Sequence, residues 1–290
     1  VLTSVGEITD FICGACPAYD RRDMISFAPN FYHLFLELPI RERFAAAAKI
    51  GCTAIEWHFP YELPKDELKA LLDDHGLEFM YCVVPADWDA GVRGLGAQPG
   101  KQDEFRRAAD QALEYIQHCD FYSINVGAGP VPAGESRERC VETYIENLDY
   151  IAAASGDHRC KFLLEPVTAR RIPDWAMQTM AQARDIVSAV GRDNVGLVYD
   201  TYHMRYEETG TLSDIMDEYW PLIGYVQIGN PPDRHEPGVG ELDLLWLARR
   251  AIEKGYQAAI GMELDPSMDT WSSLLWMNAL GYTVDPDNRL

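Results

Sequence analysis

Short apolar runs recur along the chain, and stretches with helical periodicity separate them. A run of four to eight apolar residues between turn signals predicts a buried strand, whereas apolar residues three and four positions apart predict an amphipathic helix. The eight predicted strands cover residues 25–28, 54–57, 78–84, 123–126, 161–165, 195–200, 223–228 and 258–264. The eight predicted helices cover residues 38–49, 65–75, 104–118, 137–154, 176–190, 212–220, 244–254 and 270–280.

Turn residues mark many of these boundaries. Four glycines follow predicted helices within two residues, where a left-handed cap is expected, and two prolines stand at helix starts: Gly51, Gly76, Gly191, Gly255, Pro39 and Pro64. Strict alternation of strand and helix predicts a single closed (β/α)8 TIM barrel over residues 24–290. Residues 1–23 show no clear period and are predicted to form a short N-terminal extension. An open doubly wound sheet fits less well, because no glycine-rich phosphate loop follows the first strand.

Four short apolar runs in the second half of the chain, each within a predicted strand, end on an oxygen-bearing side chain. These are Glu165, Asp200, Gln227 and Glu263, and successive ends are about 30 residues apart, the length of one strand–helix unit. Parallel strands end at the same edge of the barrel, so the four side chains are expected to converge. The set predicts a site for one divalent ion, Mg²⁺ or Mn²⁺ with Co²⁺ as an alternative, and suits zinc poorly. The competing interpretation is four separate salt-bridged or exposed strand ends.

Glu165 and Glu263 are the predicted catalytic pair. They end the fifth and eighth strands and are expected to face each other across the barrel mouth. A metal ion polarising a carbonyl and a neighbouring hydroxyl would acidify the α-proton. One glutamate would then remove this α-proton to give an enediolate, and the other glutamate would return a proton. Where the proton returns separates an aldose–ketose isomerase from an epimerase, and the sequence leaves this open.

Three residues on loops after these strands are predicted to contact the substrate. His203 is expected to bind a substrate oxygen, although it could instead cap the following helix. Arg234 offers a charged fork for a carboxylate or a hydroxyl pair, or it could simply pair with Asp233 or Glu236. Glu241 belongs to the same glycine- and proline-rich loop, and an N-cap or loop-anchoring role is equally compatible with its position.

Further residues near strand ends are weaker candidates for the pocket wall. They are Asn30, Glu56, His58, Asp87, Trp88, Arg170 and Arg171. The two arginines could meet an acidic substrate or lie on a solvated loop.

Composition narrows the range of partners. The net charge of −21 argues against nucleic acids and anionic membranes, which need clustered Lys and Arg. No apolar stretch approaches the ~20 residues that span a bilayer. Seven scattered cysteines fit free thiols in a reducing cytoplasm, and Cys13 and Cys16 form a C-x-x-C without a second pair at zinc-ribbon spacing. The expected partner is a small-molecule substrate, and a homo-oligomer is compatible with the pattern.

Several stretches resemble the xylose isomerase-like TIM-barrel superfamily, and within it the hydroxypyruvate isomerase family. The resemblance spans residues 25–281 and rests most of all on Tyr199-Asp200-Thr201-Tyr202-His203-Met204 and Glu236-Pro237-Gly238-Val239-Gly240-Glu241. Supporting matches are residues 39–47, Phe59-Pro60-Tyr61, Leu164-Glu165-Pro166, Val226-Gln227-Ile228, Arg234 and Gly255-Tyr256.

This resemblance implies a divalent metal held by the residues at 165, 200, 227 and 263, proton transfer by the two glutamates, and contacts of His203 and Arg234 with substrate. It also implies a small 2-keto acid or tetronate as substrate, its carboxylate taken by Arg234 with Arg170 or Arg171. Related ketose 3-epimerases carry a histidine as the third metal ligand, so the glutamine at position 227 resembles the isomerases rather than the epimerases. Thr168 and Pro173-Asp174 depart from the isomerase pattern of Asn and Pro-Gly.

Three functions remain open. The first is a metal-dependent isomerase of the hydroxypyruvate/tartronate semialdehyde type. The second is a ketose 3-epimerase, or a lyase or dehydratase on a keto-sugar derivative, using the same metal site. The third is a non-catalytic sugar- or metal-binding barrel. An abasic-site endonuclease is disfavoured by the net charge of −21 and by the absence of a histidine-rich zinc pattern.

Overall fold

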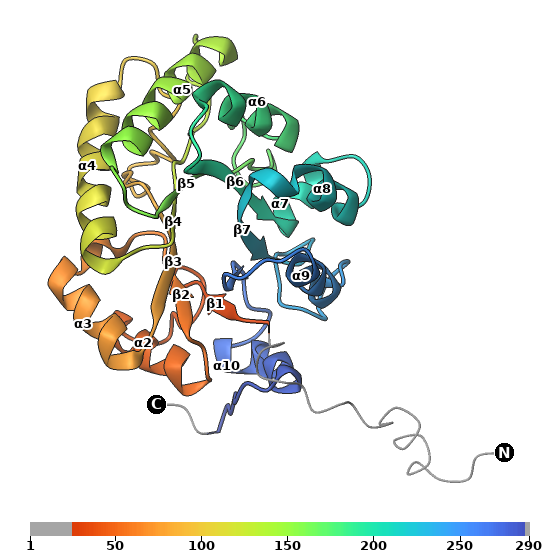
Figure 1. Cartoon of the computed structure of the whole chain (residues 1–290). Coiled ribbons are helices and arrows are strands. Elements are labelled where there is room, and N and C mark those ends of the chain that lie inside the picture. The colour runs from red at the N-terminus through yellow and green to blue at the C-terminus, as the bar shows by residue number, and fades with distance from the viewer. Residues whose placement is uncertain (1–24, 288–290) are drawn as a thin grey trace, which may run out of the picture.

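Eight parallel strands surround a central axis (Figure 1). The computed structural model describes residues 25–287. Within them the strands are β1 (Phe27–Pro29), β2 (Ala54–Glu56), β3 (Glu78–Val83), β4 (Ser123–Asn125), β5 (Lys161–Leu164), β6 (Val195–Asp200), β7 (Ile223–Ile228) and β8 (Ile260–Met262). Their order is β1-β8-β7-β6-β5-β4-β3-β2, and a parallel bridge from Asn30 to Glu56 links β1 to β2. The predicted (β/α)8 barrel is confirmed as a single, nearly closed barrel.

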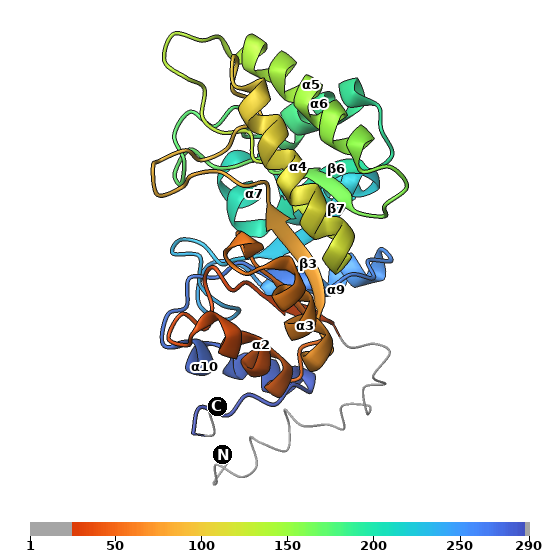
Figure 2. The same ribbon diagram turned by 90° about the vertical axis from the view of Figure 1, so that its left-hand side faces the viewer.

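Helices connect successive strands on the outside of the barrel, and in Figure 2 α2 to α5 cover the side that faces the viewer. They are α2 (Ile40–Lys49), α3 (Lys65–His75), α4 (Gln102–Cys119), α5 (Arg137–Ala154), α6 (Met180–Val190), α7 (Thr201–Glu207), α8 (Leu212–Tyr219), α9 (Leu244–Glu253) and α10 (Thr270–Ser273), with 3₁₀ segments η2 (Pro60–Glu62), η3 (Trp220–Leu222) and η4 (Leu275–Leu280). Among the helices of residues 25–287, none has both the length and the apolar character needed to cross a membrane. The predicted extension 1–23, with Cys13 and Cys16, lies outside the described residues.

The predicted capping residues lie at the ends of helices at most boundaries. Gly76 and Gly191 cap α3 and α6 in the left-handed conformation, and Gly51 and Gly255 also have positive φ angles. α6 begins four residues later than predicted, because Thr179 and Gln182 form a capping box that defines its first turn.

Two helical segments differ from the prediction. α7 was not predicted, because a seven-residue helix is too short to show a period. It begins directly after β6, where the Asp200 side chain accepts hydrogen bonds from the backbone N–H groups of Tyr202 and His203. The predicted last helix is divided, since the chain leaves α-helical geometry at Leu274 and continues as η4.

Apolar side chains pack in two layers, one inside the barrel and one between the strands and the helices. Leu163 belongs to the inner layer together with Tyr81 and Tyr225, whereas its neighbours Phe162 and Leu164 belong to the outer layer. This alternation along β5 is the two-residue period of a strand that is buried on both faces. Tyr81 and Tyr225 stack at 5.3 Å near the top of the inner layer, so the barrel is filled below the site.

Gly261 in β8 allows two polar side chains to pass close to the strand. A Cβ atom there would collide with Glu56 Oε2 and would lie 2.8 Å from Gln227 Cγ. We expect Gly261→Ala to lower the free energy of unfolding by about 1–3 kcal/mol through overpacking, as measured by urea denaturation.

Gly127→Ala is the matched control for that experiment. Its Cβ would meet its nearest atoms at 3.6 Å and its φ is not positive, so a change within about 0.5 kcal/mol is expected. Equal effects of the two substitutions would contradict the close approach at Gly261.

Candidate functional site

The pocket at the carboxyl ends of the strands has a volume of about 260 Å³. Four of the predicted catalytic, metal-binding and substrate-binding residues line it: Glu165, His203, Arg234 and Glu263. Asp200 and Gln227 are fully buried directly beside them. The remaining wall is mostly aromatic and basic: Tyr32, His33, His58, Tyr81, Trp88, Arg93, Arg171 and Trp175. The strand ends therefore converge as the barrel geometry requires.

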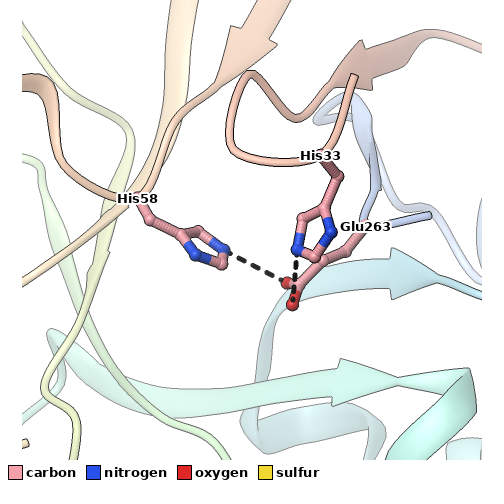
Figure 3. A group of neighbouring side chains, drawn as sticks. All are labelled: His33, His58 and Glu263. Atoms are coloured by element: carbon pink, nitrogen blue, oxygen red, sulfur yellow. Dashed lines mark ion pairs between the residues drawn. The ribbon is translucent and has the colours of Figure 1, made fainter. Parts of the chain in front are cut away.

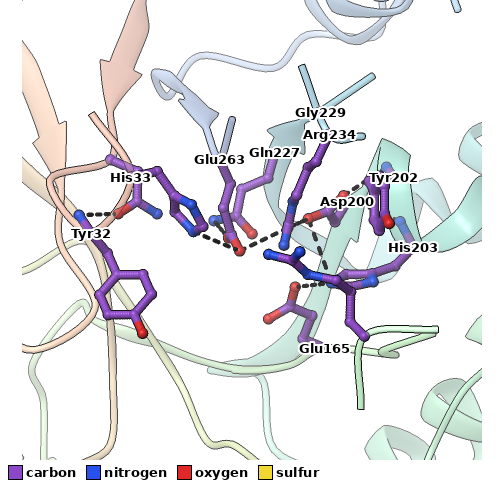
Figure 4. Close-up of polar contacts among 12 residues, drawn as sticks. Tyr32, His33, Glu165, Asp200, Tyr202, His203, Gln227, Gly229, Arg234 and Glu263 are labelled. Carbon is purple, nitrogen blue, oxygen red and sulfur yellow. Dashed lines mark hydrogen bonds and ion pairs between the residues drawn. The ribbon is translucent and has the colours of Figure 1, made fainter. Parts of the chain in front are cut away.

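Arg234 lies between two of the predicted metal ligands (Figure 4). Its Nη2 atom is 2.7 Å from Glu263 Oε1 and also contacts Asp200 Oδ2. Arg234 is 3% exposed, and its guanidinium also lies over the ring of Tyr202 at 5.2 Å. Asp200 and Glu263 thus share one buried cation.

Glu165 is held from the opposite side of the site. Its Oε2 atom accepts hydrogen bonds from the Tyr81 hydroxyl at 2.9 Å and from Asn125 Nδ2 at 2.6 Å. Asn125 also donates to the Tyr81 hydroxyl, so both donors have a defined orientation. The other carboxylate oxygen, Oε1, points toward His203 Nε2 at 3.5 Å.

Gln227 is oriented by two carboxylates. Its Nε2 atom donates to Glu263 Oε2 at 2.7 Å and to Glu56 Oε2 at 3.1 Å. The Gln227 Oε1 atom is buried and has no hydrogen-bond partner within residues 25–287. A buried amide oxygen without a partner is costly, and this oxygen is available to a ligand.

His203 occupies the third position of α7, where its ring faces the pocket. Its Nδ1 atom accepts a hydrogen bond from the backbone N–H of Thr168 at 3.3 Å, which leaves Nε2 directed at Glu165 and at Asp200 Oδ2, 3.9 Å away. Burial lowers the pKa of His203 to about 4, although the nearby Asp200 carboxylate opposes this shift. The imidazole is therefore neutral near pH 7.

The two glutamates have opposite pKa shifts in the metal-free protein. Burial raises the pKa of Glu165 well above its ordinary value, and the Glu263 and Asp200 carboxylates raise it further. Burial also raises the pKa of Glu263, but the charge of Arg234 and the neighbouring His58 and His33 lower it, and the net shift is well below the ordinary value. Burial thus favours the protonated form of Glu165, whereas the charge of Arg234 favours the ionised form of Glu263.

Two groups of buried side chains could hold a metal ion. Glu165, Asp200 and His203 place ligand atoms within 4.8 Å of one another, and so do His33, His58 and Glu263. The predicted oxygen set draws on both groups and adds Gln227. Three buried carboxylates and a partnerless amide oxygen match the hard donors that Mg²⁺ and Mn²⁺ prefer, so the residues present fit such an ion.

Glu241 is not brought to the pocket, contrary to the prediction. Its side chain is 45% exposed and pairs with Arg205 Nη2 at 2.9 Å. The glycine-rich loop places it on the outer surface next to α7, where a charged side chain remains hydrated.

The weaker candidates separate into lining and supporting residues. His58, Trp88 and Arg171 line the pocket, whereas Arg170 packs over the ring of Tyr206 at 4.2 Å. Asp87 is not part of the wall, and it accepts a hydrogen bond from the backbone of Ala90. Asn30 and Glu56 lie behind the wall, where they contact His58 and Gln227.

Some residues of the site were not predicted from the sequence. Asn125 ends β4, but in the sequence Val126 follows it within the predicted strand 123–126, so no apolar run ends on it. Tyr81 lies within β3, where a tyrosine is as common in a core as in a site. His33 and Asp265 follow their strands by several residues, so only the folded loops bring them together, at 2.8 Å.

Comparison with known proteins assigns the family. The xylose isomerase-like TIM barrel model matches residues 44–280. The 2-oxo-tetronate isomerase of Cupriavidus necator is 37% identical over 88% of this chain and 98% of its own length. The hydroxypyruvate isomerase of Escherichia coli is 35% identical over 88% and 99%, respectively.

Solved structures give the same fold. A crystal structure described as AP endonuclease, family 2, from Brucella melitensis superposes with a TM-score of 0.84 at 34% identity, covering 88% of this chain and 99% of that one. The 3-keto-D-glucoside 4-epimerase of E. coli superposes with a TM-score of 0.73 at 20% identity, covering 88% and 99%, and is alike in fold alone. With a family model matched over most of its length and relatives this similar, the chain belongs to the xylose isomerase-like TIM-barrel family.

Proposed function

We propose that this protein is a divalent-metal-dependent isomerase of small 2-keto acids, of the hydroxypyruvate or 2-oxo-tetronate type. Relatives with these two reaction names share 35% and 37% of their residues with it along nearly their whole lengths. The observation that carries the proposal is the pair of buried glutamates, Glu165 and Glu263, which line one small pocket. Isomerisation between adjacent carbons requires such a pair of proton-transfer groups.

The metal would be held by Glu165, Asp200, Gln227 through Oε1, and Glu263. Mg²⁺ or Mn²⁺ suits these oxygens best, and Co²⁺ is an alternative. Bound there, the ion would polarise the substrate's carbonyl and hydroxyl oxygens and so acidify the α-proton. The Arg234 guanidinium, held by Asp200 and Glu263, supports this assignment because a cation already lies against two of the four side chains.

The protein's own groups would carry the proton. Glu263 would remove the α-proton as the base, and Glu165 would deliver one to the neighbouring carbon as the acid. Tyr81 and Asn125 hold Glu165 by two hydrogen bonds to one oxygen, which leaves the other oxygen facing His203. His203 is neutral and can therefore donate its Nε2 proton to a substrate oxygen while the charge shifts between the two oxygens.

The pocket wall suits a small anion. A volume of about 260 Å³ lies just below the usual range for ligand sites, ~300–1,000 Å³. Arg93 lies over the Trp88 ring at 4.9 Å, and Arg171 is 3.3 Å from Asp265. Both arginines line the pocket and are the groups that we assign to the substrate carboxylate, together with Arg234.

A substrate panel tests the reaction. Protein stripped with a chelator and reloaded with Mg²⁺, Mn²⁺ or Co²⁺ should isomerise hydroxypyruvate or a 2-oxo-tetronate, followed by NMR. Removing the metal should lower kcat by at least about 10³-fold, the rate equivalent of several kcal/mol. If only ketoses react, and only at C3, the protein is an epimerase. If every compound stays inert with every metal, the proposed function is wrong.

Substitution of each glutamate tests the division of roles. Glu165→Gln and Glu263→Gln should each lower the isomerisation rate by about 10²–10⁴-fold. In D₂O, the Glu165→Gln enzyme should still exchange the substrate α-proton, because the base is intact, whereas Glu263→Gln should lose exchange as well. Metal content must be measured for both variants, since both side chains are proposed ligands. Retained isomerisation in either metal-loaded variant would exclude that residue from proton transfer.

Arg234 is expected to stabilise the metal-free protein. Arg234→Met leaves Asp200 and Glu263 buried without their cation, so the free energy of unfolding in the presence of chelator should fall by about 3–5 kcal/mol at pH 7. Without the guanidinium, the largest effect that lowers the pKa of Glu263 is lost, and burial raises this pKa above that of the unfolded chain. The variant therefore takes up protons on folding and should regain stability as the pH falls toward 5.

Arg205→Met is the matched control. It removes an arginine from an exposed pair with Glu241 and should cost less than about 1 kcal/mol. Urea denaturation at pH 7 and pH 5 measures both variants, and equal small losses would show that Arg234 does not neutralise buried charge.

A further inference from the structure

A second polar cluster lies across the pocket from Glu165. His33 follows β1, His58 follows β2 and Glu263 follows β8, and these strands are neighbours at the closure of the barrel. All three side chains are less than a tenth exposed. Figure 3 shows the two imidazole rings approaching the carboxylate of Glu263 from different sides.

The distances in this cluster do not correspond to hydrogen bonds. His33 Nε2 is 3.7 Å from Glu263 Oε1, and His58 Nε2 is 3.5 Å from Glu263 Oε2, whereas an N–H···O bond is about 2.7–3.2 Å long. Two ligands bound at ~2.0–2.1 Å to a tetrahedral ion are separated by about 3.4 Å. Each of the two separations, which run to different oxygens of Glu263, is therefore close to that of two ligands around one ion, and the three ligand atoms lie within 4.8 Å of one another.

The neighbours of both rings leave the Nε2 atoms without a proton: that of His33 is free to bind a metal, and at that of His58 an ion would replace the amide of Asn30. His33 Nδ1 is 2.8 Å from Asp265 Oδ1, the histidine–carboxylate contact that orients most metal-binding imidazoles. His58 Nε2 lies 3.1 Å from Asn30 Nδ2. Because an amide nitrogen only donates, the Nε2 atom of His58 is an acceptor and its proton is on Nδ1, which is buried without a partner in the described part of the chain.

We propose that His33, His58 and Glu263 form a second divalent-metal site, one that takes Zn²⁺. Two imidazoles and a carboxylate are the donor set of zinc sites that keep a fourth position open, and they are softer donors than the four oxygens at 165, 200, 227 and 263. All three residues line the pocket, so water or a substrate oxygen would complete the coordination.

Glu263 would link the two sites. Its Oε1 atom faces His33 and Arg234, and its Oε2 atom faces His58 and Gln227. A carboxylate with both oxygens directed in this way can bridge two cations, as it does in two-metal sites. The inference shares this residue with the proposed function but does not require the isomerase reaction.

Metal titration of the full chain tests the second site. Chelator-stripped protein is titrated with Zn²⁺ and with Co²⁺ by calorimetry, and metal content is measured after desalting. The wild type should bind one Zn²⁺ more than the double variant His33→Gln/His58→Gln. Co²⁺ should give the intense visible absorption of a four-coordinate ion in the wild type alone. His118→Gln, which removes an exposed histidine paired with Asp66, should leave both results unchanged.

A variant that keeps all three proposed ligands provides a test if the double variant misfolds. Asp265→Asn keeps every proposed ligand and changes only the partner of His33, so Zn²⁺ affinity should fall by about 10–100-fold. Circular dichroism checks the fold of each variant. If Zn²⁺ stoichiometry, affinity and the Co²⁺ spectrum are the same in the wild type, the double variant and Asp265→Asn, the cluster is only a polar network and the proposal is wrong.

The same titrations separate this proposal from the isomerase assignment. Gln227→Ala should weaken Mg²⁺ and Mn²⁺ binding and leave the His33- and His58-dependent Zn²⁺ in place. Histidine-dependent Zn²⁺ binding in a protein that turns over no keto acid would leave the second site standing without the proposed function. A protein that isomerises a keto acid with Mg²⁺ but shows no histidine-dependent Zn²⁺ binding would support the proposed function and contradict the second site.

Discussion

Buried negative charge at the carboxyl mouth of the barrel is the constraint on which the site depends. Glu165, Asp200 and Glu263 are each less than a tenth exposed, and buried carboxylates are stable only when paired or protonated. Arg234 contacts two of them, while burial and its two charged neighbours favour the protonated form of the third, Glu165. The opposite pKa shifts of the two glutamates therefore have one cause: these buried carboxyls have too little positive charge beside them. A divalent cation would add positive charge at the same place.

This concentration of charge follows from the topology. Parallel strands bring all their carboxyl ends to one edge, so an acid ending each of several strands is close to the others without any local motif. Close packing then orients the side chains: Gly261 leaves room for Glu56 and Gln227 beside β8, and the amide of Gln227 bridges Glu56 and Glu263. The alternation of apolar residues that builds the barrel thus also determines the distances in the site.

The features that could be predicted from the sequence are those that show a hydrophobic period or lie at the end of a predicted strand. The strand order and the convergence of Glu165, Asp200, Gln227 and Glu263 follow from about 30-residue spacing in a barrel. Loop residues have no such rule. Glu241 was predicted in the pocket but pairs with Arg205 on the surface, and His33 meets Asp265 across 232 residues of sequence. α7 is too short to show a period, and its cap Asp200 has two roles that the sequence does not separate: Oδ1 caps the helix and Oδ2 faces Arg234.

Loops also explain how relatives with different reaction names share this fold. The strand ends supply buried charge, whereas part of the pocket wall comes from loops that carry Trp88, Arg93 and Arg171. In this protein those arginines put local positive charge inside a pocket of about 260 Å³, on a chain whose net charge is −21. A small anion meets mainly the local arginines, but a long polyanion must also approach the whole negative surface. The combination supports a small keto acid, rather than a nucleic acid, as the molecule that reaches Glu165 and Glu263.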